Sequence, residues 1–340
     1  MTPPGREALA ARIRAFVDGS LRGAPPESFD ELAVAIARWQ AAHSPVLAAL
    51  APPPDTVDAI PPVPVELFKR LPVGTVTAEP APVCFRTSGT TGSGRGTQRL
   101  WSADLYDHGA LAWARRCVPD LPAQVVALLE DPVTAPDSSL SHMVALFPRP
   151  PGDASWHVVD GVADLPSLVA RLRAAEGPVF LATTAFALAE ALTVSLPRLP
   201  DGSLVMITGG FKGRATVLDD STLVAETRRV LHPKRVVTEY GMTELSSQLW
   251  GHPGDAFRAP PWLRATAVDP ATGAPVPRGE PGQLRFLDLC TLDAAVHVET
   301  LDLGLVHGDG AVTLLGRLPG AEARGCSLTV EEAWARRGAS

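Results

Sequence analysis

The sequence predicts an α/β fold in which helices cover a mostly parallel β-sheet. Between residue 83 and about residue 240, short apolar runs alternate with segments of helical periodicity, and this alternation is typical of βαβ units. The expected strands are 83–86, 125–129, 144–147, 179–182, 204–208 and 235–238. The expected helices are 103–117, 165–175, 186–196 and 221–231. After about residue 260 short strands and turn signals follow one another, which predicts a small β-rich subdomain.

The residues before this core follow a different sequence pattern. Residues 5–50 carry apolar side chains at helical spacing, and proline-rich stretches follow at 52–64 and 72–82. These patterns predict helices and then an extended segment that lies over the core. The expected parts are N-terminal helices with the extended segment at 1–82, an α/β core at 83–260, the β-rich subdomain at 261–316 and a short C-terminal tail at 317–340.

Composition limits the class of protein. With 340 residues, of which 46% are hydrophobic, the chain can fill one large or two medium domains. Its net charge of −7 argues against a general nucleic-acid surface, which needs clustered Lys and Arg. No apolar stretch is long enough to span a bilayer and no signal peptide is recognisable, so we expect a cytoplasmic protein with no membrane partner. The four cysteines are far apart, which predicts neither a zinc site nor a disulfide framework. They are Cys84, Cys117, Cys290 and Cys326.

A loop rich in glycine and hydroxyl residues follows the first expected strand. Small residues let backbone N–H groups approach an oxyanion, and the hydroxyls add donors, so this loop can cradle a nucleotide phosphate. By composition alone it could equally be a flexible surface loop. Gly89 and Gly94 have the spacing of a Walker P-loop, but Arg95 and Gly96 replace the Lys and Ser/Thr that this motif requires. The phosphate-binding residues are expected to be Thr87, Ser88, Gly89, Thr90, Thr91 and Gly92.

A second motif ends the strand-like run at 235–238. An aromatic ring, a hydroxyl and a carboxylate at the carboxyl end of a strand can stack a base, bind a phosphate and hold Mg²⁺. Alone, the motif could be ordinary strand-end chemistry. Its residues are Tyr240, Gly241, Met242, Thr243 and Glu244.

Weaker signals accompany these two motifs. A glycine run after the expected strand 204–208 would let a flat ring lie against backbone, and Lys212 within it could meet a carboxylate or a phosphate. The run includes Gly209, Gly210 and Phe211. Downstream, Asp302 could bind ribose hydroxyls, and Arg317 adds a cation at the end of the β-rich region.

Taken in order, these motifs resemble those of the adenylate-forming superfamily, which includes acyl-CoA synthetases, nonribosomal adenylation domains and luciferases. The resemblance covers residues 85–317. It implies the large N-terminal domain of that fold, with ATP and Mg²⁺ as cofactors and an acyl-adenylate formed from a carboxylic acid. The α/β core at 83–260 would then bind the nucleotide and the acyl group. It assigns the phosphates to the loop 87–92, the α-phosphate to Thr243 and the magnesium to Glu244. The adenine would lie by Gly209, Gly210 and Tyr240, with Phe211, Gly241 and Met242 beside them, and the ribose by Asp302 and Arg317.

Other segments suggest which branch of this superfamily the chain resembles. Many members carry a C-terminal swinging domain with a catalytic lysine, and we expect it to be absent from this chain. Residues 209–212, 138–144 and 324–328 resemble the acyl-protein synthetases of bioluminescence fatty-acid reductase systems. That resemblance implies that the acyl group passes to a cysteine near the C-terminus, here Cys326, and then to a partner protein.

The resulting hypothesis is an ATP-dependent acid–thiol ligase. The acid's carboxylate attacks the α-phosphorus while Lys212 and Thr243 stabilise charge, and His142 is a candidate for the wall of the acyl pocket. Three alternatives stay open. The enzyme could pass its acyl group to coenzyme A, a carrier protein or an amine without using Cys326. The chain could be a nonenzymatic partner subunit with a nucleotide fold, or a plain α/β domain that binds no ATP.

Overall fold

The computed structural model describes residues 2–77, 79–87, 94–148, 153–209 and 220–318. Contacts between residues divide the chain into two compact units. The first unit comprises 1–110, 242–247 and 259–340, and the second comprises 111–241 and 248–258. Within the described ranges, no helix is both long and apolar enough to cross a membrane.

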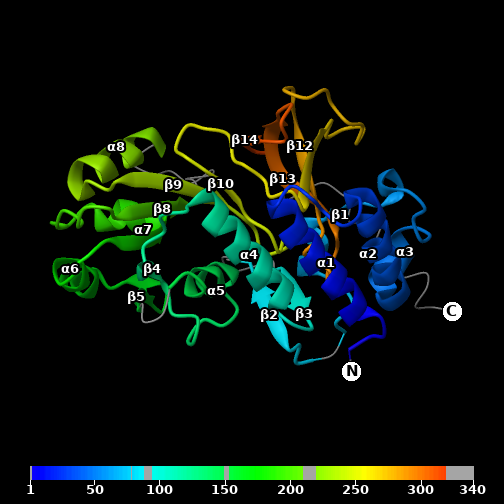
Figure 1. Ribbon diagram of the computed structural model, residues 1–340, viewed down its shortest axis with the longest axis horizontal. Helices are drawn as coiled ribbons and strands as arrows, with labels where there is room; N and C mark the ends of the chain where they lie inside the picture. The colour runs from blue at the N-terminus through cyan, green and yellow to red at the C-terminus, as the bar shows by residue number, and fades with distance from the viewer. Residues whose placement is uncertain (1, 78, 88–93, 149–152, 210–219, 319–340) are drawn as a thin grey trace. The chain divides into compact units, whose positions relative to one another are not determined.

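The second unit is built on a seven-stranded sheet (Figure 1). Its strand order is β10-β9-β8-β7-β4-β5-β6, in which β4, β5, β7, β8 and β9 are parallel and the edge strands β6 and β10 are antiparallel. The bounds are β4 Gln124–Glu130, β5 Ala154–Val159, β6 Val162–Ala163, β7 Val179–Thr184, β8 Leu204–Thr208, β9 Arg235–Tyr240 and β10 Leu249–Gly251. This mostly parallel sheet confirms the α/β fold expected from the alternating pattern.

Helices cover both faces of that sheet. The helices of this unit are α5 Ser139–Ala145, α6 Leu165–Arg173, α7 Ala185–Ala191 and α8 Asp220–Leu231. Apolar residues of α6, α7 and α8 form one buried cluster with alternate strand residues such as Leu181 and Val205. Phe180 points to the opposite face because successive side chains alternate along a strand, and its ring lies 5.7 Å from that of Phe147. The long apolar strands are therefore buried on both sides, as the sequence pattern predicts.

Two sequence expectations in this unit are wrong. Residues 144–147 do not form a strand, because α5 runs through Ala145. Ser138 starts this helix by accepting a hydrogen bond from the backbone N–H of Ser141, so the apolar run belongs to a buried helix end. The strand that pairs with β4 is β5, whose residues are only partly buried and therefore lack a continuous apolar signature. The helix expected over 186–196 is also shorter, since α7 ends at Ala191.

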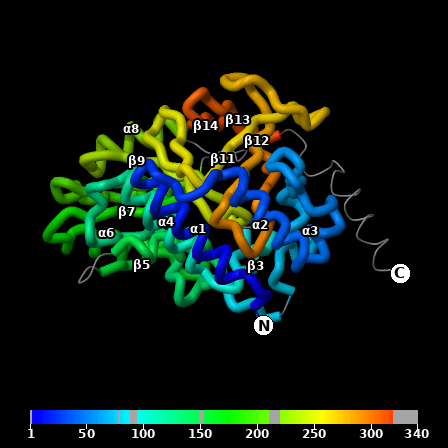
Figure 2. The backbone as a smooth tube through the Cα atoms, turned by 45° about the vertical axis from the view of Figure 1, so that its right-hand side comes forward, coloured from blue at the N-terminus to red at the C-terminus, as the bar shows by residue number. Residues whose placement is uncertain are grey.

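The first unit contains a five-stranded sheet and a separate hairpin. In the sheet, β1-β13-β12-β11 are neighbours and β14 pairs with β13. Figure 2 shows the blue N-terminal segment beside the orange strands, where β1 pairs in parallel with β13. The bounds are β1 Val63–Pro64, β2 Val83–Arg86, β3 Thr97–Leu100, β11 Leu263–Val268, β12 Pro281–Asp288, β13 His297–Val306 and β14 Val312–Arg317. By contacts, residues 83–110 group with this unit rather than with the parallel sheet that follows them.

Helices form the amino-terminal part of the first unit. Their bounds are α1 Arg6–Leu21, α2 Phe29–His43, α3 Pro45–Leu50, η1 Val57–Ala59 and η2 Val65–Lys69. Helix α4, Asp104–Cys117, begins in this unit and continues into the second. A capping box between Ser28 and Glu31 starts α2. The side chain of each residue accepts a hydrogen bond from the backbone N–H of the other, which satisfies two donors at the first turn.

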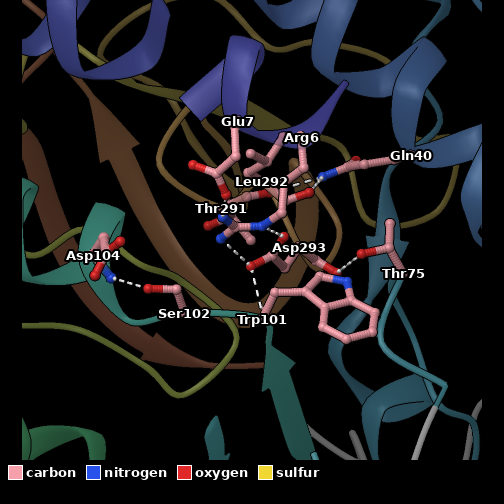
Figure 3. Close-up of polar contacts among 10 residues, drawn as sticks. All are labelled: Arg6, Glu7, Gln40, Thr75, Trp101, Ser102, Asp104, Thr291, Leu292 and Asp293. Carbon is pink, nitrogen blue, oxygen red and sulfur yellow. Dashed lines mark hydrogen bonds and ion pairs between the residues drawn. The ribbon is translucent and has the colours of Figure 1, made fainter. Parts of the chain in front are cut away.

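A buried ion pair joins α1 to the segment after β12 (Figure 3). The Arg6 guanidinium donates two hydrogen bonds to the Asp293 carboxylate, of 2.8 and 2.7 Å, and both side chains are almost fully buried. The same carboxylate accepts from the backbone N–H of Trp101 at 3.0 Å, and Gln40 donates to the backbone carbonyls of Thr291 and Leu292. Asp293 therefore holds the first helix and the end of the β2–β3 hairpin in one polar cluster.

Candidate functional site

The hairpin β2–β3 holds the two ends of the predicted phosphate loop together. The two strands are antiparallel with Arg86 opposite Thr97. Beyond that pair, the N–H of Thr87 donates to the carbonyl of Gly96, and the N–H of Gly96 donates to the hydroxyl of Thr87, both at 2.9 Å. Arg95 donates from Nε to the Thr87 carbonyl at 2.7 Å, so it braces the base of the loop. Ser88, Gly89, Thr90, Thr91 and Gly92 lie outside the described residues.

Glu244 lies against the base of this loop. It belongs to a turn closed by a hydrogen bond from the N–H of Leu245 to the carbonyl of Met242, and it is only 6% exposed. A Cβ added to Gly96 would lie 3.4 Å from Glu244 Oε1 and 3.1 Å from Thr87 Cγ2. The absence of a side chain at Gly96 therefore lets the carboxylate approach the loop, and the fold brings together two motifs that are far apart in the chain.

Gln98 fixes the turn that carries Glu244. The amide of Gln98 is fully buried on β3, and its Nε2 donates to the backbone carbonyl of Glu244 at 3.3 Å. This bond ties the hairpin to the acidic motif directly. Sequence reasoning missed Gln98. No motif includes this residue, and its burial becomes visible only in the structure.

The electrostatics around Glu244 suit a divalent cation. Burial raises the pKa of Glu244 to about 7, the nearby cations Lys69 and Arg317 lower it, and Glu66 raises it further. No hydrogen bond from another residue to its carboxylate oxygens is present in the described part of the chain. Mg²⁺ binds through one or two carboxylates together with waters and substrate phosphates, and a buried carboxylate beside a phosphate loop fits that requirement. The described residues contain no group of three or more candidate metal ligands.

The predicted ribose pair is assembled by the β-rich sheet. Asp302 on β13 and Arg317 on β14 are opposite each other in register, and Arg317 Nε lies 3.2 Å from Asp302 Oδ1. The carboxylate is 2% exposed, whereas the guanidinium is 60% exposed. Arg317 is also close enough to lower the pKa of Glu244. The first unit thus contains the loop base, the acidic carboxylate and the Asp302–Arg317 pair.

The remaining predicted nucleotide residues belong to the second unit. Strands β8 and β9 are parallel neighbours with Thr208 opposite Glu239, so Gly209 and Tyr240 leave the same edge of the sheet. Gly209 has a φ of +67°, a conformation that glycine adopts readily. Tyr240 is 5% exposed, and its ring centroid lies 6.0 Å from that of Phe257. Gly210, Phe211 and Lys212 lie outside the described residues.

A buried carboxylate supports this edge of the sheet. The Thr208 hydroxyl donates to Glu239, which is 4% exposed. A Cβ added to Gly241 would lie 2.6 Å from Glu239 Oε1, so a side chain here would force the Glu239 carboxylate to move. Sequence reasoning did not assign a role to Glu239, although it stands directly before Tyr240 in the second motif.

The second motif is divided between the two units. Tyr240 and Gly241 belong to the second unit, whereas Met242, Thr243 and Glu244 belong to the first. His142 is half-buried on α5 in the second unit, and Cys326 lies outside the described residues. Lys69 and Glu66, both on η2, are further residues near Glu244 that the motifs did not indicate.

Comparison with known proteins finds one curated relative and several solved structures that are similar to this chain. No model of a known protein family matches the chain. The long-chain-fatty-acid–luciferin-component ligase of Vibrio harveyi is 28% identical over 142 residues, which is 38% of each chain. Among solved structures, ATP-bound MatB from Rhodopseudomonas palustris has a TM-score of 0.52 with 20% identity, over 72% of this chain and 49% of that one. O-succinylbenzoate coenzyme A synthetase (MenE) from Bacillus subtilis, in complex with ATP and magnesium, has a TM-score of 0.50 with 16% identity, over 71% of this chain and 51% of that one.

These relatives are longer than the region they share with this chain. The chain spans about half the length of the solved structures and 38% of the curated relative. The likeness to the solved structures concerns the fold, and the Vibrio harveyi ligase adds a likeness in sequence. The chain therefore has the α/β fold of the adenylate-forming enzymes, and the resemblance to their superfamily that its motifs predicted is confirmed.

Proposed function

We propose that this chain uses ATP and Mg²⁺ to activate a carboxylic acid as its acyl-adenylate and then transfers the acyl group to a protein thiol. The observation that carries the proposal is the closeness of the buried Glu244 carboxylate to Gly96, which is hydrogen-bonded to Thr87 at the base of the loop. The carboxylate that is predicted to bind magnesium therefore lies near the base of the loop that is predicted to bind phosphate, which supports the proposal. The ribose candidates Asp302 and Arg317 belong to the same unit.

The first half-reaction is an in-line displacement on ATP. One carboxylate oxygen of the acid attacks the α-phosphorus, the bond from that phosphorus to the bridging oxygen of the β-phosphate breaks, and pyrophosphate leaves with the electron pair. Magnesium held by Glu244 would neutralise phosphate charge. The loop's N–H and hydroxyl donors bind the departing phosphates, and Thr243 donates to an oxygen of the α-phosphate. Asp302 accepts from a ribose hydroxyl while Arg317 holds its carboxylate in place.

The acid is proposed to be a long-chain fatty acid. This class comes from the name of the Vibrio harveyi relative, which covers less than half of this chain. Exchange of labelled pyrophosphate into ATP, measured with fatty, aromatic and amino acids, tests both the reaction and the acid. We expect exchange that depends on a fatty acid and on magnesium.

A pair of variants makes this test specific to the site. Glu244→Ala should abolish exchange, whereas Glu280→Ala should leave it unchanged, because Glu280 is an exposed acid in a turn of the same unit. Exchange that survives in Glu244→Ala, or no exchange with any acid, would refute the proposal. The second result would favour a nonenzymatic subunit.

The second half-reaction is proposed to use Cys326. Its thiolate attacks the carbonyl carbon of the acyl-adenylate, a thioester forms, and AMP leaves with the bonding electrons. Among the described thiols, burial raises the pKa of Cys117 to about 11 and raises that of Cys290 well above its usual value. Both are protonated at neutral pH and are poor nucleophiles, because the thiolate is the reactive form. Cys84 is half-buried on β2.

Covalent loading can be measured directly. Incubation with ATP, magnesium and labelled fatty acid, followed by denaturing gel analysis, should show label on the wild-type chain and on Cys84→Ser, and none on Cys326→Ser. If Cys326→Ser keeps full acyl transfer to an added acceptor, the acyl group passes directly to coenzyme A, a carrier protein or an amine.

A further inference from the structure

The chain has only three lysines, at positions 69, 212 and 234. Lys234 in the second unit is paired with Asp120 at 2.8 Å, and Lys212 lies outside the described residues. Lys69 is exposed at the end of η2. Within the described ranges its ammonium makes no hydrogen bond or ion pair, so it is available to a ligand.

Lys69 lies beside Gly94, which follows the predicted phosphate loop in the chain. Helix η2 contacts both β3 and β13 within the first unit, which places it between the hairpin and the strand that carries Asp302. A Cβ added to Gly94 would lie 3.5 Å from the backbone carbonyl oxygen of Lys69. Gly94 is the first described residue after the loop, so the backbone of Lys69 is in van der Waals range of the loop's end.

The charge of Lys69 acts on the carboxylates of the same site. It lowers the pKa of Glu244 and that of Glu66, which burial raises in both cases. One oxygen of Glu66 is buried without a hydrogen-bond partner in the described structure. Lys69 is therefore near Glu244 as well as near the loop, although it is far from both in sequence.

We infer that Lys69 binds the β- and γ-phosphates of ATP at the end of the loop and stabilises the pyrophosphate that leaves. This inference rests on the proposed function and adds to it the residue that meets the leaving group. Lysine binds phosphate as a compact point charge with three donors. The ammonium keeps its proton throughout the step, while the electron pair of the broken P–O bond stays on pyrophosphate beside it. From the sequence alone, Lys212 was the expected cation of the reaction.

Binding measurements can separate this role from a general effect on nucleotide affinity. Calorimetric titration with magnesium pyrophosphate, and separately with AMP, should be carried out on wild type, Lys69→Met and Lys69→Arg. Lys69→Met should weaken pyrophosphate binding by about tenfold or more, equivalent to about 1.4 kcal/mol. AMP affinity should stay within about twofold, because AMP lacks the phosphates that Lys69 contacts. Lys69→Arg should recover part of the pyrophosphate affinity by keeping the charge.

Arg22→Met is the matched control. Arg22 is an exposed cation at the end of α1 in the same unit, so this variant makes the same change in net charge and should bind both ligands as wild type does. Thermal unfolding should show that all variants are folded. In the exchange assay, Lys69→Met should raise the KM for pyrophosphate more than the KM for the acid.

The outcomes distinguish the two proposals. Unchanged pyrophosphate binding in Lys69→Met, or an equal loss for pyrophosphate and AMP, would overturn the role of Lys69 while exchange by the wild type still supports the proposed function. Absence of both exchange and pyrophosphate binding in the wild type would overturn both.

Discussion

Replacing Glu244 by glutamine should change how the stability of the ligand-free protein depends on pH. The buried carboxyl has a pKa of about 7, whereas the ordinary value is 4.5. Between these two values the folded protein holds a proton that the unfolded chain has released. The free energy of unfolding therefore falls as pH rises through this window. Glutamine has nearly the same shape, does not titrate and resembles the protonated acid.

The size of the effect follows from the gap between the two pKa values. Each pKa unit corresponds to about 1.4 kcal/mol, so the difference in unfolding free energy between Glu244→Gln and wild type should grow by about 3 kcal/mol from pH 4.5 to pH 8. The 6% exposure of Glu244 leaves little solvent screening. Other titrating groups are common to both proteins and largely cancel in the difference. A change of this size is a large part of the stability of a typical domain.

Urea unfolding at half-unit steps of pH, without nucleotide or metal, measures the effect. The two proteins should converge at low pH and separate as the pH passes neutrality, with the glutamine variant the more stable. Adding ATP and magnesium should stabilise wild type more than Glu244→Gln, because only the carboxylate supplies a charged ligand to the metal. A difference that is the same at every pH would refute the account of a buried carboxyl with a raised pKa.

Three other changes test the surroundings of the site. Gly96→Ala should reduce pyrophosphate exchange by about tenfold or more, with a smaller effect on stability. The reason is that the new Cβ would lie 3.1 Å from Thr87 Cγ2 and 3.4 Å from Glu244 Oε1. Full exchange would contradict this prediction. Asp293→Ala should lower the free energy of unfolding by about 3–5 kcal/mol, measured in urea, because it leaves the buried Arg6 without its partner. Burial lowers the pKa of His297 to about 4 from 6.5, so the free energy of unfolding of the wild type should fall by about 3 kcal/mol relative to that of His297→Asn as the pH drops from 6.5 to 4. His297→Asn should lose this acid dependence, and an unchanged slope would show that the imidazole is not its source.

The central sheet could be predicted from the sequence because its strands are buried on both faces. Runs such as 125–129 and 204–208 are continuously apolar, and each corresponds to a parallel strand. The strand β5 was not predicted because it is only partly buried. The run 144–147 was wrongly predicted to be a strand, because a short buried helix end has the same composition as a buried strand. Local composition therefore identifies burial more readily than it identifies the type of element.

The order of the motifs was enough to name residues that the fold brings together from separate segments. Asp302 and Arg317 do come together, and Glu244 does lie at the base of the phosphate loop. The positions of Lys69 and Gln98 near Glu244 could not be predicted from the sequence. They depend on how η2 and β3 pack against segments distant in sequence, and no local pattern encodes those contacts.

The pairing of Arg6 with Asp293 bears on how the amino end of this protein can be altered. Asp293 is also the acceptor for the N–H of Trp101, directly after the strand that closes the phosphate loop. Trimming the chain past its first six residues would leave a carboxylate buried among neutral groups next to that strand. If the chain binds ATP as proposed, the truncation should lower ATP affinity as well as melting temperature, although the residues removed belong to none of the nucleotide motifs.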